Sequence, residues 1–254
     1  MLSEDQRDRL DVVLVSPRNP LNIGAVARAM ANFGFSRMTV VAPYEAHWRE
    51  ARSAVGAPQV LQDAKCTQYL PEALADCTLV VGTGSLTYRK PEQPVVRLPD
   101  LPQLVGEEMA RGGRVALVFG PEKHGLTRED LSHCHMLAEI PTDPRQPSMN
   151  LGQAAAVCLY ELAMRASRPD APGKGAAPSA VPSSRLEILA GVIEQVMAAA
   201  EYSPAAMRQA NQHDLRVLLR RLALSEADTR RVLGIFRRIL WRLKRTQSAK
   251  ESRQ

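Results

Sequence analysis

Short apolar runs alternate, along the first two thirds of the chain, with segments in which apolar residues recur every three or four positions. The runs have the length and composition of buried β-strands. The spaced segments have the period of helices with one apolar face. We predict strands at residues 11–16, 38–43, 78–83, 114–120 and 136–141, and a weaker one at 64–69. We predict helices at residues 22–33, 45–55, 71–76, 100–111, 127–133 and 150–165.

This alternation predicts an α/β fold in which a mostly parallel sheet has helices on both faces. In such sheets ligands bind beyond the carboxyl ends of the strands. Three loops rich in Gly or Pro follow predicted strands there: "VVGTGS", "VFGPEKHGL" and "IPTDPRQPSMN". No GxGxxG follows the first strand, and the chain has no GxxxxGK[ST] and no GxSxG. Dinucleotide binding, a P-loop and a nucleophile elbow therefore lose support.

A segment without hydrophobic period divides the chain. Residues 167–184, "SRPDAPGKGAAPSAVPSS", are rich in Pro, Gly, Ala and Ser, which is typical of a flexible linker. It separates a predicted domain at residues 1–166 from a predicted helical extension at residues 185–254. The extension carries 14 Lys and Arg against 7 Asp and Glu, whereas residues 1–184 carry 19 against 20. The positive excess in the extension favours an acidic polymer, nucleic acid rather than membrane, as partner.

The location of the protein is indicated by three absences. No run of eighteen apolar residues is present, and the N-terminus "MLSEDQRDRLD" is too charged for a signal peptide. The four cysteines are scattered, without a CxxC pair. We expect reduced thiols and a cytoplasmic protein with no membrane partner. The tripeptide "HCH" at residues 133–135 looks metal-like, but adjacent residues rarely converge on one ion, so no metal is expected.

The extension contains two capping patterns, Ser184 with Glu187 and Ser225 with Asp228, which predict helix starts. In the last predicted helix, one face is apolar: Val232, Ile235, Phe236, Ile239, Leu240 and Leu243. The opposite face is basic: Arg230, Arg231, Arg237, Arg238, Arg242, Lys244 and Arg245. Trp241 falls within the basic face. It is expected to stack on an unpaired base, to lie under a guanidinium, or to pack against the predicted domain at residues 1–166 or a partner chain.

The position of Arg28 in the predicted helix of "NPLNIGAVARAMANFGF" has two interpretations. Arg28 points away from the apolar face, among the small residues Ala25, Ala29 and Asn32. One interpretation is a solvated arginine on an amphipathic helix. The other is a surface that another backbone or a ligand approaches closely.

Three segments, taken in order, resemble the motifs of the SPOUT methyltransferase superfamily, TrmH-like branch: "NPLNIGAVARAMANFGF", "LVFGPEKHGL" and "IPTDPRQPSMNLGQAAAVCLYEL". The resemblance covers about residues 11–166. It implies S-adenosyl-L-methionine-dependent methylation of a ribose 2′-hydroxyl of RNA, and a C-terminal trefoil knot in the sheet. The extension is similar to that of the TrmJ group, which methylates position 32 in the anticodon loop of tRNA.

The resemblance also implies the site residues. Those implied for cofactor binding are Thr83, Gly84, Ser85, Phe119, Gly120, Glu122, Gly125, Ile140, Ser148, Met149 and Leu151. Those implied for catalysis are Arg28, Ser148, Asn150, Asn22 and Glu122. Since a guanidinium holds its proton strongly, Arg28 is expected to grip an RNA phosphate and stabilise the developing alkoxide. Helix capping is the alternative for Asn150 with Gln153, and an exposed loop charge is the alternative for Glu122.

One segment with expected RNA contacts departs from the pattern of the family. "GTGSLTYRKPEQP" departs from the GTxxRxR pattern of relatives, because Leu86 stands where the first arginine belongs. The expected RNA-binding residues are Arg28, Arg89, Lys90, Arg237, Arg238, Trp241 and Arg242. The alternatives are another tRNA position or rRNA as substrate, a non-catalytic RNA-binding protein with this fold, and an enzyme that acts on a small molecule with a nucleotide cofactor.

The resemblance further implies a homodimer in which one chain completes the cofactor pocket of the other. The segment "NLGQAAAVCLYELAM" is apolar nearly all round, as expected either of a dimer interface or of a core helix. Dimerisation through this segment and the small-residue face would bring Arg28 of one chain toward its partner's cofactor.

Overall fold

Seven parallel strands form a single sheet in the first part of the chain, in the order β3-β2-β1-β6-β4-β7-β5. The computed structural model describes residues 2–84, 91–165 and 181–251. The strands are β1 (Leu10–Val15), β2 (Met38–Val41), β3 (Lys65–Thr67), β4 (Leu79–Thr83), β5 (Val95–Arg97), β6 (Val115–Phe119) and β7 (Met136–Glu139). All six predicted strands are confirmed. The trefoil knot stays a prediction.

β5 was not expected from the sequence. It has only three residues, and Pro94 and Pro99 flank it closely. Proline cannot donate to a strand ladder, so the segment lacks the signal of a central strand. β5 is nevertheless consistent with this rule, because it lies at the edge of the sheet and pairs only with β7 among the described strands.

The helices of the first part are α1 (Glu4–Arg7), α2 (Pro20–Phe33), α3 (Pro58–Gln62), α4 (Leu70–Ala73), α5 (Leu101–Ala110), α6 (Arg128–Ser132) and α7 (Leu151–Arg165), with the 3₁₀ turns η1 (Trp48–Glu50) and η2 (Leu98–Asp100). Five of the six predicted helices are confirmed. The helix predicted at residues 45–55 is wrong, because only η1 forms there.

Tertiary contacts replace the expected helix at residues 45–55. Trp48 is buried in the core, and the hydroxyl of Ser53 donates a hydrogen bond of 2.6 Å to the carbonyl oxygen of Leu21. A Cβ on Gly24 of α2 would lie 2.2 Å from Ser53 Oγ and 2.9 Å from the Ala54 nitrogen. The segment therefore follows the surface of α2 at backbone contact, and this packing overrides the local helix propensity.

The sheet has an apolar layer on each face. One layer contains side chains of α2, α5 and α7, including Met30, Met109 and Leu159. The other contains Leu70 and Leu74, together with the loops and α6 between β6 and β7. All four cysteines are free thiols, and burial raises the pKa of Cys77, Cys134 and Cys158 to about 12. These three thiols therefore act as packing groups.

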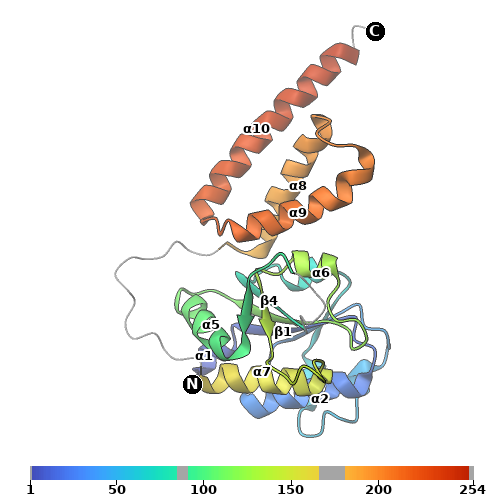
Figure 1. Cartoon of the computed structure of the whole chain (residues 1–254), viewed down its shortest axis with the longest axis vertical. Coiled ribbons are helices and arrows are strands. Elements are labelled where there is room, and N and C mark those ends of the chain that lie inside the picture. Colours follow the sequence, from blue (N-terminus) through green and yellow to red (C-terminus); the bar gives the residue numbers. More distant parts are fainter. Residues whose placement is uncertain (1, 85–90, 166–180, 252–254) are drawn as a thin grey trace.

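Three helices form the extension: α8 (Ser183–Ala199), α9 (Arg208–Arg221) and α10 (Glu226–Glu251), with the turn η3 (Ala205–Met207) before α9. They share a small apolar core around Leu189, Ile193, Leu219 and Leu233. The extension lies over the face of the sheet that carries α4 and α6 (Figure 1). The predicted linker, residues 167–184, falls mostly on residues 166–180, which lie outside the described residues. No helix in the described parts of the chain is long and apolar enough to cross a membrane.

The predicted cap at Ser184 is wrong, whereas the one at Ser225 is confirmed. α8 starts at Ser183, whose backbone nitrogen and hydroxyl both donate 2.9 Å bonds to the carbonyl of Cys77. Contact with the first part of the chain thus fixes the start of α8, without a capping side chain. Ser225 accepts a hydrogen bond of 3.1 Å from the Asp228 backbone at the start of α10, as expected.

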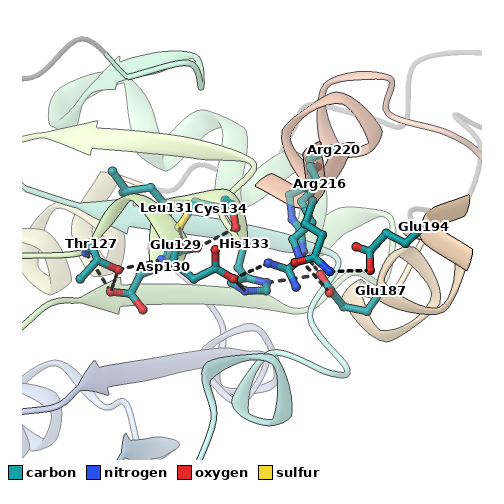
Figure 2. A network of polar contacts seen from close by, with 12 residues as sticks. Thr127, Glu129, Asp130, Leu131, His133, Cys134, Glu187, Glu194, Arg216 and Arg220 are labelled. Atoms are coloured by element: carbon teal, nitrogen blue, oxygen red, sulfur yellow. Dashed lines mark hydrogen bonds and ion pairs between the residues drawn. The ribbon is translucent and has the colours of Figure 1, made fainter. Parts of the chain in front are cut away.

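A network of charged side chains joins the extension to α6 (Figure 2). Arg220 of α9 is 5% exposed and donates a 2.7 Å bond to Glu187 of α8. Arg216 pairs with both Glu187, at 3.4 Å, and Glu129 of α6. His133, which directly follows α6, lies 3.3 Å from Glu187. We call these five residues the docking network.

Glu187 is the centre of the docking network. Burial alone would raise the pKa of its carboxyl group, but hydrogen bonds from His133 and Arg220 outweigh burial and lower the pKa to about 2. Glu187 is therefore a carboxylate at neutral pH. Its charge compensates Arg220, which would otherwise be buried without an anion.

Candidate active site

A pocket of about 390 Å³ opens beyond the carboxyl ends of β4, β6 and β7. Ten of the eleven predicted cofactor residues line it; Ser85 lies outside the described residues. The ten are Thr83, Gly84, Phe119, Gly120, Glu122, Gly125, Ile140, Ser148, Met149 and Leu151. The position is the one expected for ligands of parallel sheets. Six further residues line the pocket; they lie within the quoted motif segments but are not among the predicted cofactor residues: Pro121, Lys123, His124, Thr142, Pro147 and Ala154.

The loop after β6 forms one wall of the pocket and depends on two glycines. A Cβ on Gly120 would lie 2.2 Å from the Leu126 nitrogen and 2.3 Å from the Gly125 carbonyl carbon. Gly125 has φ +63°, in the left-handed region that favours glycine. The loop thus folds back on itself at backbone contact, which a side chain at position 120 would prevent.

Glu122 connects the pocket to the N-terminus of α2. Its two carboxylate oxygens accept bonds from the Arg18 amide (3.0 Å), the Asn19 amide (3.1 Å) and Asn22 Nδ2 (2.9 Å). Burial would raise the pKa of this carboxyl group, but these hydrogen bonds outweigh burial and hold the pKa below its ordinary value. Glu122 is therefore an ionised acceptor that fixes the loop before α2.

Asn150 continues this polar chain and also caps α7, so the capping interpretation is confirmed and its catalytic role stays a prediction. Its Nδ2 donates a 3.0 Å bond to Asn22 Oδ1, and its Oδ1 accepts from the Gly152 amide at 2.9 Å and the Gln153 amide at 3.4 Å. The chain Glu122–Asn22–Asn150 therefore ties the starts of α2 and α7 together beside the pocket. Ser148 lies two residues before Asn150, exposed on the pocket wall.

Arg28 lies apart from this group. Its side chain is exposed on α2, it does not line the pocket, and it forms no hydrogen bond or ion pair with the described residues. The small residues beside it serve contact with α7 of the same chain, since a Cβ on Gly152 would lie 2.7 Å from Ala25 Cβ. Close approach of another backbone is thus confirmed, and that backbone is α7.

The predicted RNA-binding residues lie at several places. Arg237, Arg238, Trp241 and Arg242 are exposed on α10, whereas Arg89 and Lys90 lie outside the described residues. The Trp241 ring has the guanidinium carbons of Arg238 and Arg245 at 4.3 and 5.0 Å from its centroid. Of the environments expected for Trp241, the one under a guanidinium is therefore present.

The "HCH" side chains do not converge on one point. His133 faces Glu187, Cys134 is buried, and His135 Nδ1 accepts a 3.0 Å bond from the Val80 amide. Burial lowers the pKa of His135 to about 3.

One group of potential metal ligands occurs in the described parts of the chain: Glu92, His213 and Asp214. Arg128 already lies between its two carboxylates, 2.8 Å from Glu92 and 3.5 Å from Asp214. A guanidinium supplies the positive charge there that a cation would otherwise bring.

Fold and pocket together define an α/β protein that holds a small ligand at the carboxyl edge of a parallel sheet. The model of the SpoU rRNA Methylase family matches residues 9–160, so the chain belongs to this family. The match runs from the start of β1 into α7 and includes every strand and the whole pocket. The resemblance seen in the three sequence motifs is thus confirmed.

Individual relatives extend the comparison to the rest of the chain. The chain is 40% identical over 158 residues to the tRNA (cytidine/uridine/adenosine-2′-O-)-methyltransferase TrmJ of Pseudomonas aeruginosa, over 62% of this chain but only 61% of that protein's length. It is 32% identical over 245 residues to the tRNA (cytidine/uridine-2′-O-)-methyltransferase TrmJ of Cronobacter sakazakii, over 94% of this chain and 97% of that protein. The crystal structure of TrmJ from Z. mobilis superposes with a TM-score of 0.79 at 29% identity, covering 90% of this chain and 98% of that one.

Proposed function

We propose that this chain is an S-adenosyl-L-methionine-dependent tRNA 2′-O-methyltransferase that acts at position 32 of the anticodon loop in the cytoplasm. The observation that carries the proposal is the pocket, because the family's loops meet there from three separate strands. The match to the Cronobacter tRNA methyltransferase runs through the extension as well as the sheet, which supports tRNA over rRNA.

The pocket fits the cofactor in size and in chemistry. Its volume of about 390 Å³ falls in the range of small-molecule sites. Phe119, Ile140, Met149 and Leu151 offer apolar surface for the adenine, and the backbone at Gly84 is open to close approach. The cofactor, when bound, supplies an electrophilic methyl group.

A methyl group on Gly120 tests the role of the pocket. Gly120→Ala is expected to weaken S-adenosyl-L-methionine binding about tenfold or more. The added Cβ would collide with the backbone nitrogen of Leu126, so the loop that lines the pocket would have to shift. Isothermal titration calorimetry of the cofactor against the purified variant measures this. The matched control is Gly234→Ala, which adds the same methyl group in open space on α10. Equal affinity in wild type and Gly120→Ala would place the cofactor elsewhere.

The side chains around the pocket divide the chemical work. Glu122 and Asn22 are proposed as positioning residues, since their polar atoms bond to each other and to the loop before α2. Ser148 and Asn150 are proposed to orient the ribose at the pocket wall. Arg28 is proposed to grip the RNA phosphate and stabilise the alkoxide, and the reaction is proposed to need no metal.

We further propose that the protein acts as a homodimer. One face of α7 is buried, and Val157, Tyr160 and Met164 form an exposed apolar row along the helix, in which the Tyr160 ring meets Phe33 of α2 edge to face. These residues recur at helical spacing, so one partner surface covers all three. Since Arg28 is outside the pocket of its own chain, a dimer also provides the route by which it reaches a reacting ribose.

The basic face of α10 is proposed to hold the tRNA. The apolar face of this helix packs on α8, and Arg237, Arg238 and Arg242 on the opposite face are exposed. Like charges so closely spaced on one helix face repel one another until an anion binds. Arg89 and Lys90 are proposed as a second contact near the pocket.

Removal of the positive charges from the basic face of α10 should weaken RNA binding without a change in cofactor binding. Replacing Arg237, Arg238 and Arg242 together by Gln is expected to weaken tRNA binding roughly tenfold or more and to flatten its salt dependence. Cofactor affinity should stay unchanged, because none of the described residues of α10 lines the pocket. Filter binding across a salt series measures the effect, and the same three positions changed to Lys are the control that keeps the charge. An unchanged salt slope in the Gln variant would exclude this face as the tRNA site.

The activity itself is tested by mass-spectrometric mapping of 2′-O-methyl groups on tRNA from cells with and without this gene. Loss of the methyl group at position 32, restored by the purified protein with cofactor and tRNA, is the expected result. Loss at another tRNA position or in rRNA would reassign the substrate. Cofactor binding without transfer to RNA would favour a non-catalytic protein or a small-molecule enzyme. Activity that disappears in EDTA and returns only with a divalent ion would contradict the metal-free reaction, provided that the RNA stays folded.

A further inference from the structure

Arg18 and Tyr44 form an exposed pair beside the pocket that none of the sequence motifs assigns. The guanidinium carbon of Arg18 lies 5.6 Å from the centroid of the Tyr44 ring, within cation–π range. Tyr44 is nevertheless 72% exposed. The ring therefore keeps much of its surface free for a ligand, and the positive charge of Arg18 is held next to it.

The pair is fixed relative to the pocket by its backbone. The Arg18 amide donates its 3.0 Å bond to Glu122, whose side chain lines the pocket. The Tyr44 amide donates a 3.2 Å bond to the carbonyl of Pro17, so the loop after β2 is tied to the loop after β1. The backbones of both residues are thus linked through Glu122 to the pocket wall, and neither side chain lines the pocket itself.

The two loops also contain backbone conformations that side chains rarely adopt. Ser16 has φ +44° and Ala42 has φ +43°, both in the left-handed region. The Ser16 amide donates a 2.8 Å bond to Val41, and the Ala42 amide donates a 2.9 Å bond to Thr67. The neighbouring strands therefore hold these strained turns in place, and a surrounding structure that enforces such turns is common at ligand-binding sites.

We propose that the Arg18–Tyr44 pair is a stacking site for an unpaired base of the RNA substrate, next to the nucleotide whose ribose enters the pocket. An aromatic ring with an adjacent arginine is the usual combination for single-stranded RNA, since the ring stacks on the base and the guanidinium contacts the phosphate. The inference rests on the proposed function, because it takes RNA as the substrate. It adds a contact that determines which nucleotides flank the methylated one.

The test compares the full-length protein with its Tyr44→Leu and Tyr44→Phe variants on an anticodon stem-loop RNA. Tyr44→Leu is expected to weaken RNA binding roughly 5- to 100-fold, whereas Tyr44→Phe keeps the ring and stays within about twofold of wild type. Cofactor affinity should be equal in all three proteins. Because Tyr44 is exposed, neither variant removes a core contact.

A set of RNAs that each lack one loop base locates the stacked nucleotide. One abasic position should weaken binding to the wild type by the same factor as Tyr44→Leu, and that position should have no further effect on Tyr44→Leu. Arg18→Gln should lower the slope of log Kd against log salt by about 0.7. Arg111→Gln is the charge-matched control, because Arg111 follows α5 at the amino end of β6, at the opposite edge of the sheet.

The outcomes separate this inference from the proposed function. If the wild type is active and Tyr44→Leu binds RNA as tightly as the wild type does, the stacking site alone is overturned. A loss of dimer mass in Tyr44→Leu, measured by light scattering, would assign the pair to a protein interface and also overturn it. A wild type that neither binds nor methylates tRNA would overturn the proposed function and the stacking site together.

Discussion

Arg28→Ala is expected to lower the single-turnover rate of methyl transfer by about 100- to 1000-fold, while cofactor affinity stays within about twofold of wild type. The reason is that a guanidinium stays protonated in proteins, so its role toward a developing alkoxide and a phosphate is electrostatic. Because Arg28 is exposed on α2 and lies outside the pocket of its own chain, its substitution should leave cofactor affinity unchanged. Rapid-quench kinetics with excess enzyme measure the rate.

Two controls sharpen this prediction. Arg28→Lys keeps the charge but loses the planar fork, so an intermediate rate is expected. Asn32→Ala changes an exposed residue one turn further along the same helix and should leave the rate unchanged. If Arg28→Ala keeps a near wild-type rate, the arginine is only a solvated residue of an amphipathic helix.

The same variant reports whether Arg28 acts across the dimer. Mixed with a Gly120→Ala chain, it should recover activity, because one site of the mixed dimer then combines an intact pocket with the Arg28 of its partner. If Arg28 served its own pocket, neither site would be complete and no activity would return. Size-exclusion chromatography verifies that the mixed dimer forms.

Glu187→Gln is expected to lower the Tm by about 10 °C. The substitution removes the carboxylate that compensates Arg220, and breaking a buried pair from one side costs about 3–5 kcal/mol. Glu194→Gln is the matched control two turns along α8, where the partner is the neutral amide of Gln212. Scanning calorimetry of both variants measures the difference, and equal Tm values for the two would contradict the role of Glu187.

The effect of Glu187 should depend on pH in one direction. Its pKa is about 2 in the folded protein, below the ordinary value of 4.5. A carboxyl group with a depressed folded pKa stabilises the protein fully above its unfolded pKa and loses that contribution as the pH falls toward the folded one. The Tm difference between wild type and Glu187→Gln should therefore be constant near neutrality and shrink between about pH 4.5 and pH 2.

The pocket is predictable from the sequence because its loops are local features. Gly120, Gly125 and Ser148 each stand in a loop that directly follows an apolar run, and parallel strands bring such loops to one edge. The strands are predictable as well, because strands buried on both faces are apolar without interruption. The helix predicted at residues 45–55 does not form, since the conformation of this segment is set by contact with Gly24 and not by its own residues.

Long-range partners of charged residues leave no local signal. Glu187 stands three positions after Ser184, and that spacing predicts a capping box. In the structure its partners are His133, Arg216 and Arg220, which are 29 to 54 positions away. Arg18 and Tyr44 likewise come together only through the loops after β1 and β2. Sequence spacing therefore identifies the pocket but neither the docking network nor the stacking site.

α6 begins at Arg128, three residues after Gly125 of the pocket loop, and its Glu129 also belongs to the docking network. One short helix thus adjoins the pocket at its start and contacts the extension, which we propose binds tRNA. Thermodynamic linkage then demands reciprocity: whatever factor tRNA adds to cofactor affinity, cofactor must add to tRNA affinity. If the two affinities are coupled in this way, RNA binding to the extension raises the occupancy of the pocket by S-adenosyl-L-methionine. The methyl donor would then be bound in proportion to the RNA that is bound.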